Sequence, residues 1–275
     1  MVVEHPGDRM IKRIVLVIVL ALAAACASGP KRPPTGTLEP DKFLHERGTE
    51  ALNERKWLTA REYFRQLADV YPQSPYRADA KLGIGDTYLG EGTAESFLLG
   101  INEFREFLSY YPTHRRADYA QYKLGMAHYY QMRAPERDQT ETREAIRELT
   151  AFMERFPSSA LREEGAAKLR DARDRLSASE QHVGVHYHRQ RWWPGAIERF
   201  KGILERDPNF THRDETYFYL AEALERMQRP AEALPYYDRL IKEFEKSEFL
   251  LEAQKRSEAI RNGMEKKEPP DPKRG

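Results

Sequence analysis

The stretch GINEFREFLSYYPTHRRADYAQY, residues Gly100–Tyr122, contains the spacing on which the fold prediction rests. The small residue Gly100 is followed four positions later by Phe104, and Pro112 comes eight positions after that. A small residue lets two antiparallel helices approach closely, and a bulky side chain one turn later fills the space above it. Proline cannot continue a helix. The stretch therefore predicts the second helix of an antiparallel pair, ending near Pro112.

The same ladder of small, bulky and proline residues returns four more times with unchanged internal spacing. Its copies are Ala60, Phe64 and Pro72; Ala145, Leu149 and Pro157; Ala196, Phe200 and Pro208; and Ala233 and Tyr237, where Glu245 replaces the proline. A matching first helix lies upstream, as at Gly184 and Tyr187 before Ala196. This pattern resembles the tetratricopeptide (TPR) repeat, whose period of about 34 residues the copy at 177–210 keeps without insertion.

We therefore predict an all-α fold, an α-α superhelix of about five TPR-like helix pairs with a C-terminal capping helix. No segment of useful length has the alternating pattern of a strand. The expected pairs are 42–54 with 58–70, 76–90 with 94–110, 117–132 with 142–156, 161–189 with 194–206, and 214–227 with 231–244, and the capping helix is 248–261.

The amino-acid composition says little about function, except that it does not call for a strongly charged partner. The chain has 275 residues, with 45 basic and 44 acidic side chains, so its charge is near zero. Nothing in this balance demands nucleic acid. The single cysteine, Cys26, cannot form a disulfide within the chain.

The N-terminal segment has the layout of a bacterial secretory signal over residues 1–25, with Met10 as an alternative start. Lys12 and Arg13 precede an apolar run that is too short for a confident membrane span. The run ends in LAAAC, which resembles a lipobox, so we expect Cys26 to be lipidated with fatty acyl chains such as palmitate. An ordinary signal peptide cleaved near Ala25 is the alternative.

The mature chain divides into three parts by composition. Residues 26–40 are rich in Pro, Gly and Thr and are expected to form a flexible tether. Residues 41–262 hold the helical repeats. The charged, proline-rich residues 263–275 are expected to form a disordered tail.

Three segments go beyond general TPR character. They are YPTHRRADYA at 111–120, ERDQT at 136–140, and 169–191, most of which lies in the predicted long helix. Together with the lipobox they resemble the BamD family, the TPR lipoproteins of the outer-membrane β-barrel assembly machine (Bam complex). The resemblance covers nearly the whole mature chain.

The resemblance implies a lipid-anchored scaffold on the periplasmic face of the cell outer membrane. It implies binding to the periplasmic domains of the barrel-forming BamA subunit, to other Bam lipoproteins, and to the C-terminal signals of unfolded outer-membrane proteins that await insertion. In the family, the N-terminal repeats are associated with substrate and the C-terminal repeats with BamA. No nucleic acid and no cofactor is implied.

The first helices of TPR pairs line a concave face that suits an extended or helical peptide. Aromatic residues with nearby cations there would suit an aromatic C-terminus with its carboxylate. The candidates are Tyr88, Tyr119, Tyr122, Tyr129, Arg116 and Lys123, with Lys81 as a further cation. Tyr88 is better interpreted as a core residue, and for Tyr119 and Tyr122 groove and core remain open.

Three residues after the predicted long helix, two in the following turn and one in the next helix, are candidates for partner binding. By alignment with the family, Arg199 falls where a basic residue contacts BamA; an ordinary exposed arginine is the alternative. Trp192 beside Arg191 could anchor an interface, although packing is favoured for the tryptophan.

The sequence gives no sign of catalysis or of a metal. His182 and His186 lie one helical turn apart, but no ligands of the usual spacing complete a site. Walker A, G-x-S-x-G and zincin patterns do not occur. We therefore expect a protein that is not an enzyme and binds no metal.

Two other functions fit a TPR chain. One is a periplasmic adaptor that coordinates envelope constriction or peptidoglycan synthesis, although such proteins usually lack a lipobox. The other is a lytic enzyme targeted by its repeats, which ranks last because the chain leaves no room for a catalytic domain.

Overall fold

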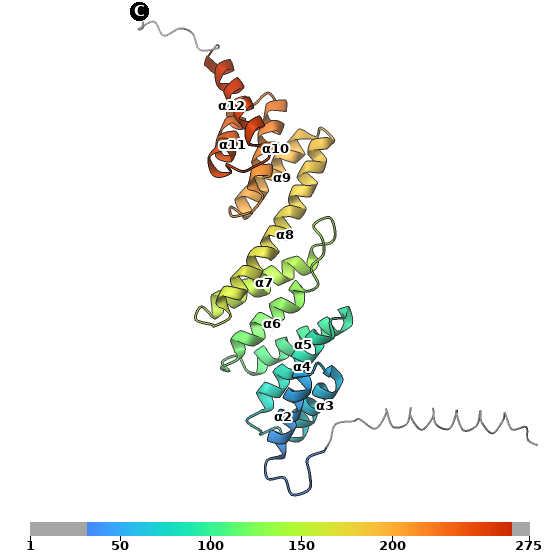
Figure 1. Cartoon of the computed structure of the whole chain (residues 1–275). Coiled ribbons are helices and arrows are strands. Elements are labelled where there is room, and N and C mark those ends of the chain that lie inside the picture. The colour runs from blue at the N-terminus through green and yellow to red at the C-terminus, as the bar shows by residue number, and fades with distance from the viewer. Residues whose placement is uncertain (1–31, 266–275) are drawn as a thin grey trace, which may run out of the picture. The chain divides into compact units, whose positions relative to one another are not determined.

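The computed structural model describes residues 32–265, so the predicted signal segment, Cys26 and most of the predicted tail lie outside the described residues. The described part is helical and contains no β-strand. It divides into two compact units, one ending at Leu124 and the other beginning at Gly125, within helix α6 (Ala117–Tyr129). Figure 1 shows the elements in chain order.

The first unit contains two complete antiparallel pairs and the start of α6. The pairs are α2 (Pro40–Asn53) with α3 (Trp57–Val70), and α4 (Arg77–Glu91) with α5 (Ala94–Tyr110). Phe64 lies between glycines of two neighbouring helices, because a Cβ at Gly48 or at Gly83 would come within 2.6 or 2.5 Å of its ring. These close approaches explain why small residues occupy the first helices.

The second unit begins in α6 and continues to the end of the described chain. Its helices are α7 (Thr140–Arg155), α8 (Arg162–Arg189), α9 (Trp193–Arg206), α10 (Arg213–Arg226), α11 (Pro230–Glu243) and α12 (Leu250–Glu265). The 28-residue α8 packs against α7 and also against α9, and it runs between them without a break (Figure 1). One helix therefore serves two successive pairs.

The ladder residues form the core of both units. Phe104, Leu149, Phe200 and Tyr237 have no exposed surface, and Phe64 is 2% exposed. Each ladder proline is the second residue after its helix, as Pro112 is after α5. The predicted all-α fold of TPR-like pairs with a C-terminal capping helix is confirmed.

The helix ends differ from the prediction by a few residues. The first helix begins at Pro40, with Glu39 as its N-cap residue. Helix α6 ends at Tyr129 rather than at residue 132, and α12 continues to Glu265, past the predicted end of the helical region at 262. Between residues 32 and 265, no helix is both long enough and apolar enough to cross a lipid bilayer.

Candidate functional site

The structure brings three of the predicted substrate residues together in the first unit. We call Tyr119, Arg116, Lys123, Asp79 and Asp86 the Tyr119 cluster. The half-buried Tyr119 donates its hydroxyl hydrogen to the Asp86 carboxylate, with oxygen separations of 2.8 and 2.9 Å. The Arg116 guanidinium lies 4.4 Å from the centre of the same ring, and the Lys123 ammonium lies 5.4 Å from it. The phenol is thus held between a carboxylate and two cations.

The cations of the Tyr119 cluster are paired with acids. Arg116 Nη1 donates to Asp79 at 3.1 Å, and Lys123 Nζ lies 3.2 Å from Asp86. Burial, followed by the Asp86 charge, raises the pKa of Tyr119, so its hydroxyl remains a donor at neutral pH. These counter-ions do not stand out in the sequence, where acidic residues occur on every polar face.

Two other predicted substrate tyrosines lie in the core. Tyr88 is 5% exposed and Tyr122 is 6% exposed. The Arg61 guanidinium stacks 3.7 Å from the centre of the Tyr88 ring, and Arg65 Nη2 donates to the Tyr88 hydroxyl at 2.6 Å. The burial of Tyr88 agrees with core packing, the interpretation favoured from the sequence. Tyr122 is buried in the same way.

Tyr129 belongs to the second unit, where it is half-buried. Its hydroxyl donates to Asp171 at 2.6 Å, and the Lys168 ammonium lies 5.0 Å from its ring centre. Burial and the hydrogen bond to Asp171 raise its pKa to about 12. Tyr129 thus repeats the combination of phenol, carboxylate and cation seen at Tyr119.

Two of the predicted partner-binding residues, Trp192 and Arg199, lie beside Tyr187, near the turn between α8 and α9. We call Trp192, Tyr187, Arg199 and Glu180 the Trp192 cluster. The Trp192 ring is 54% exposed and meets Tyr187 edge-on, with 4.5 Å between ring centres. Arg199 lies 6.0 Å from the Tyr187 ring centre and donates to Glu180 at 2.7 Å. An exposed tryptophan and an arginine therefore flank one tyrosine.

Arg191, the third predicted partner-binding residue, forms the turn itself. Its φ of 61° is in the left-handed region, which non-glycine residues adopt infrequently. This conformation lets α8 stop and α9 begin within three residues, and it places Trp192 immediately before α9.

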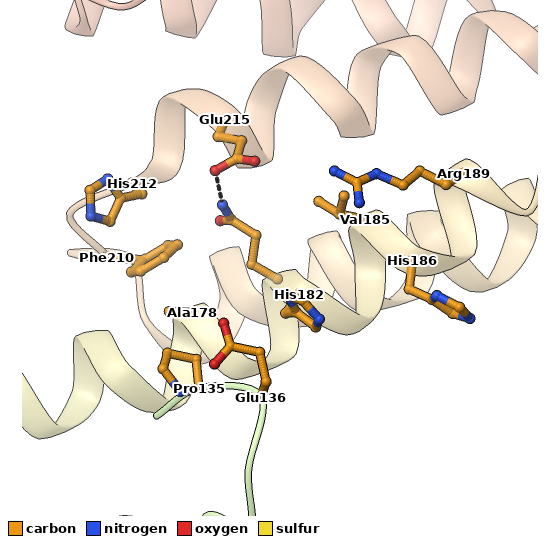
Figure 2. Close-up of a pocket in the computed structure, with 11 residues that line it drawn as sticks. Pro135, Glu136, Ala178, His182, Val185, His186, Arg189, Phe210, His212 and Glu215 are labelled. Atoms are coloured by element: carbon orange, nitrogen blue, oxygen red, sulfur yellow. Dashed lines mark hydrogen bonds between the residues drawn. The ribbon is translucent and has the colours of Figure 1, made fainter. Parts of the chain in front are cut away.

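A pocket of about 360 Å³ lies between α8, the start of α10 and the loop before α7 (Figure 2). Helix α8 contributes His182, His186 and Arg189, and Glu215 comes from α10. In Figure 2 the Glu136 carboxylate lies on the opposite side of the pocket from Glu215. The lining therefore mixes imidazole, guanidinium and carboxylate groups.

Sequence reasoning missed this pocket because its parts come from separate pairs. His182 and His186 lie in α8, whereas Phe210, His212 and Glu215 come 24 to 33 residues later in the chain. Gln181, which also lines the pocket, donates a hydrogen bond to Glu215. The available signal was the ERDQT segment, which supplies Glu136.

Comparisons with known proteins point to one family. The family model YfiO, described as "Outer membrane lipoprotein", matches residues 38–234. The outer membrane protein assembly factor BamD of Caulobacter vibrioides is 30% identical over 212 residues, which cover 76% of this chain and 68% of that protein. BamD of Neisseria gonorrhoeae is 24% identical over 256 residues, covering 88% and 95%. BamD of Haemophilus influenzae is 24% identical over 231 residues, covering 80% and 85%.

Proposed function

Because this chain belongs to the YfiO family of outer membrane lipoproteins, whose curated relatives are BamD assembly factors, we propose that it is an outer-membrane protein assembly factor. It acts as a scaffold without catalysis, on the periplasmic face of the outer membrane. One observation carries the proposal: the family match over residues 38–234 spans the helices from α2 into α11, and thus both units.

Attachment to the membrane occurs through Cys26, which lies outside the described residues. The LAAAC sequence supports this attachment. More than one acyl chain on the mature N-terminal cysteine gives stable anchoring, whereas a single chain binds only marginally. Residues 27–39 then connect the lipid to α2.

The Trp192 cluster is the proposed contact for a BamA-like barrel subunit. Tryptophan, tyrosine and arginine are the residue types that most often dominate binding energy at interfaces. Here they occur together, and the tryptophan is 54% exposed. Arg199 donates to Glu180 at 2.7 Å, and a guanidinium carries five N–H donors, so this contact suits an acidic or carbonyl-rich surface on the partner.

The Tyr119 cluster is the proposed contact for the aromatic C-terminal signal of an unfolded outer-membrane protein. The Tyr119 ring offers a stacking surface, and Arg116 and Lys123 offer charge. Only one of the five N–H groups of Arg116 is used in its bond to Asp79. A peptide carboxylate therefore binds Arg116 beside Asp79, or replaces Asp86 at Lys123.

Affinity purification tests the function. The lipidated full chain is isolated from detergent-solubilised membranes of its own organism, and we expect a large barrel protein to co-purify. Recovery of peptidoglycan-synthesis proteins without a barrel protein would favour the adaptor role instead. Arg199→Glu combined with Trp192→Ala should reduce recovery of the barrel protein severalfold.

Arg229→Glu is the matched control for the Trp192 cluster. Arg229, like Arg199, is 41% exposed and pairs with one glutamate, but it lies at the turn before α11. We expect this control variant to recover as much of the barrel protein as the wild type does. If the Arg199→Glu, Trp192→Ala variant recovers as much barrel protein as the wild type, the Trp192 cluster is not the contact surface. That result would not argue against the assembly function.

Peptide titration tests the Tyr119 cluster. A labelled peptide with a C-terminal aromatic residue is compared with its amidated form, and amidation should weaken binding because it removes the carboxylate. Tyr119→Leu and Arg116→Gln should each weaken binding of the free-acid peptide by about tenfold, corresponding to 1.4 kcal/mol. Unchanged affinity in folded variants would exclude this surface.

A further inference from the structure

His128 in α6 is a buried imidazole with one nitrogen engaged and the other unsatisfied. The residue is 5% exposed. Its Nδ1 lies 2.7 Å from Glu141 Oε2, and Nε2 is buried without a hydrogen-bond partner among residues 32–265. An unsatisfied buried polar atom costs about 1–3 kcal/mol, so its presence needs a reason.

Two further glutamates of α7 lie close to this ring. Glu141, Glu144 and Glu148 are spaced three and four residues apart, which places them on one face of the helix. Ligand atoms of His128, Glu144 and Glu148 all lie within 4.8 Å of one another. Glu144 and Glu148 are only 30% and 12% exposed. One imidazole and two carboxylates thus converge between α6 and α7.

We propose that His128, Glu144 and Glu148 bind a divalent transition-metal ion, of which Zn²⁺ is the natural probe. Imidazole and carboxylate ligands bind zinc at about 2.0–2.2 Å, so a small contraction of the three groups completes the site. Glu141 holds the ring through Nδ1, which leaves Nε2 for the metal; metal-binding histidines are commonly oriented in this way by a carboxylate. Water fills the remaining position.

Arg147 occupies the region of the two carboxylates in the protein without metal. Its Nη2 lies 2.5 Å from Glu144 and 2.7 Å from Glu148, while its side chain is 58% exposed. A long, exposed side chain can move into solvent at little cost, and the dication then replaces one positive charge by two. The site therefore exchanges a surface guanidinium for a metal that connects α6 to α7.

Isothermal titration of the full mature chain with Zn²⁺ tests the site. We expect one ion per chain, with binding weakened at least tenfold in Glu144→Gln and in Glu148→Gln. Arg147→Gln removes the competing cation, so it should tighten binding. Tighter Zn²⁺ binding in Arg147→Gln is the most specific expectation, because neither a loss of structure nor the removal of an acidic side chain would strengthen binding.

His182 and His186 provide the control, since two histidines one turn apart on a helix could bind zinc adventitiously. The double change His182→Gln, His186→Gln should leave the titration unchanged. His128→Gln should abolish it, with circular dichroism reporting whether the variant folds. If His128→Gln does not fold, Co²⁺ absorption in Arg147→Gln provides a second measurement, because four-coordinate Co²⁺ absorbs visible light much more strongly than the free aqueous ion. Binding that depends on His182 and His186, or no saturable binding, would overturn the proposal, which is independent of the assembly function.

Discussion

Gly184 of α8 lies directly against the ring of Phe200 in α9: a Cβ at position 184 would come within 2.6 Å of Phe200 Cε1. Phe200 has no exposed surface, so its ring has nowhere to withdraw. Overpacking of a close-packed core typically costs about 1–3 kcal/mol. We predict that Gly184→Ala lowers the free energy of unfolding by that amount in urea denaturation.

Gly263→Ala is the control for this prediction. Nothing lies within 4 Å of a Cβ at Gly263, which is exposed in α12. Replacement of a helical glycine by alanine in open space stabilises by about 0.5–1 kcal/mol. A stabilising effect at Gly184 as well would contradict the proposed contact with Phe200.

The Glu222 carboxylate predicts a specific loss of stability in acid. The His188 ring, whose Nε2 lies 3.1 Å away, and then the Arg256 guanidinium lower its pKa from 4.5 to about 2. Because the folded pKa is below the unfolded one, the stabilisation is complete above pH 4.5 and is lost as the pH falls toward 2. It amounts to about 3 kcal/mol.

The comparison of Glu222→Gln with the wild type measures this effect. The difference in unfolding free energy should be largest at neutral pH and should shrink between pH 4.5 and 3. Glu232→Gln, at an exposed pair with Arg229, should change stability little at any pH. A pH-independent difference for Glu222→Gln would show that its carboxylate titrates normally in the folded protein.

The bidentate pair of Arg170 and Asp207 ties α8 to the end of α9. Arg170 Nη1 and Nη2 donate to the Asp207 carboxylate at 2.8 and 2.5 Å, and Ser177 Oγ donates to it at 2.7 Å. Burial alone would raise the pKa of Asp207, but these hydrogen bonds lower it. Arg170→Gln leaves a buried carboxylate poorly paired, and should destabilise by about 3 kcal/mol.

A double-mutant cycle checks the coupling of this pair. Asp207→Asn combined with Arg170→Gln should cost clearly less than the sum of the two single changes. Thermal or urea unfolding provides the four free energies. Additive effects would mean that the two side chains stabilise the fold independently.

Arg61 supports a prediction about a conservative change. It is 8% exposed, donates to Thr87 at 2.9 Å and to Glu91 at 2.5 Å, and stacks on Tyr88. Lysine has no planar guanidinium to stack and donate at the same time. Arg61→Lys should therefore lower the unfolding free energy by about 2 kcal/mol, whereas Arg47→Lys, at an exposed pair, should leave it unchanged.

The fold was predictable because one packing rule recurs. A small residue, a bulky residue and a proline at fixed spacing define where helices meet and where they stop, and Ala196, Phe200 and Pro208 do so in the same way as Gly100, Phe104 and Pro112. Helix ends were less accurate where no proline marks them, as in α6. There the sequence continues with helix-compatible residues after Tyr129, but the chain turns.

The candidate site was only partly predictable, since it depends on which face of a helix meets its neighbours. Tyr119 and Tyr122 are three residues apart in α6, and sequence spacing could not decide between groove and core. The structure buries Tyr122, so Tyr119 is the better position for a binding variant. Pairs such as Arg61 with Thr87 join positions 26 residues apart, and that distance carries no sequence signal.

At about 1.5 Å per residue, the 28 residues of α8 form a rod about 42 Å long. Its N-terminal part packs in the pair with α7 and its C-terminal part in the pair with α9, and no loop interrupts it. A tilt imposed on α9 is therefore passed along the rod to α7 with no hinge to absorb it. A partner that binds at Trp192 therefore contacts the C-terminal end of α8, and the N-terminal end of the same helix packs against α7, which carries Glu144 and Glu148.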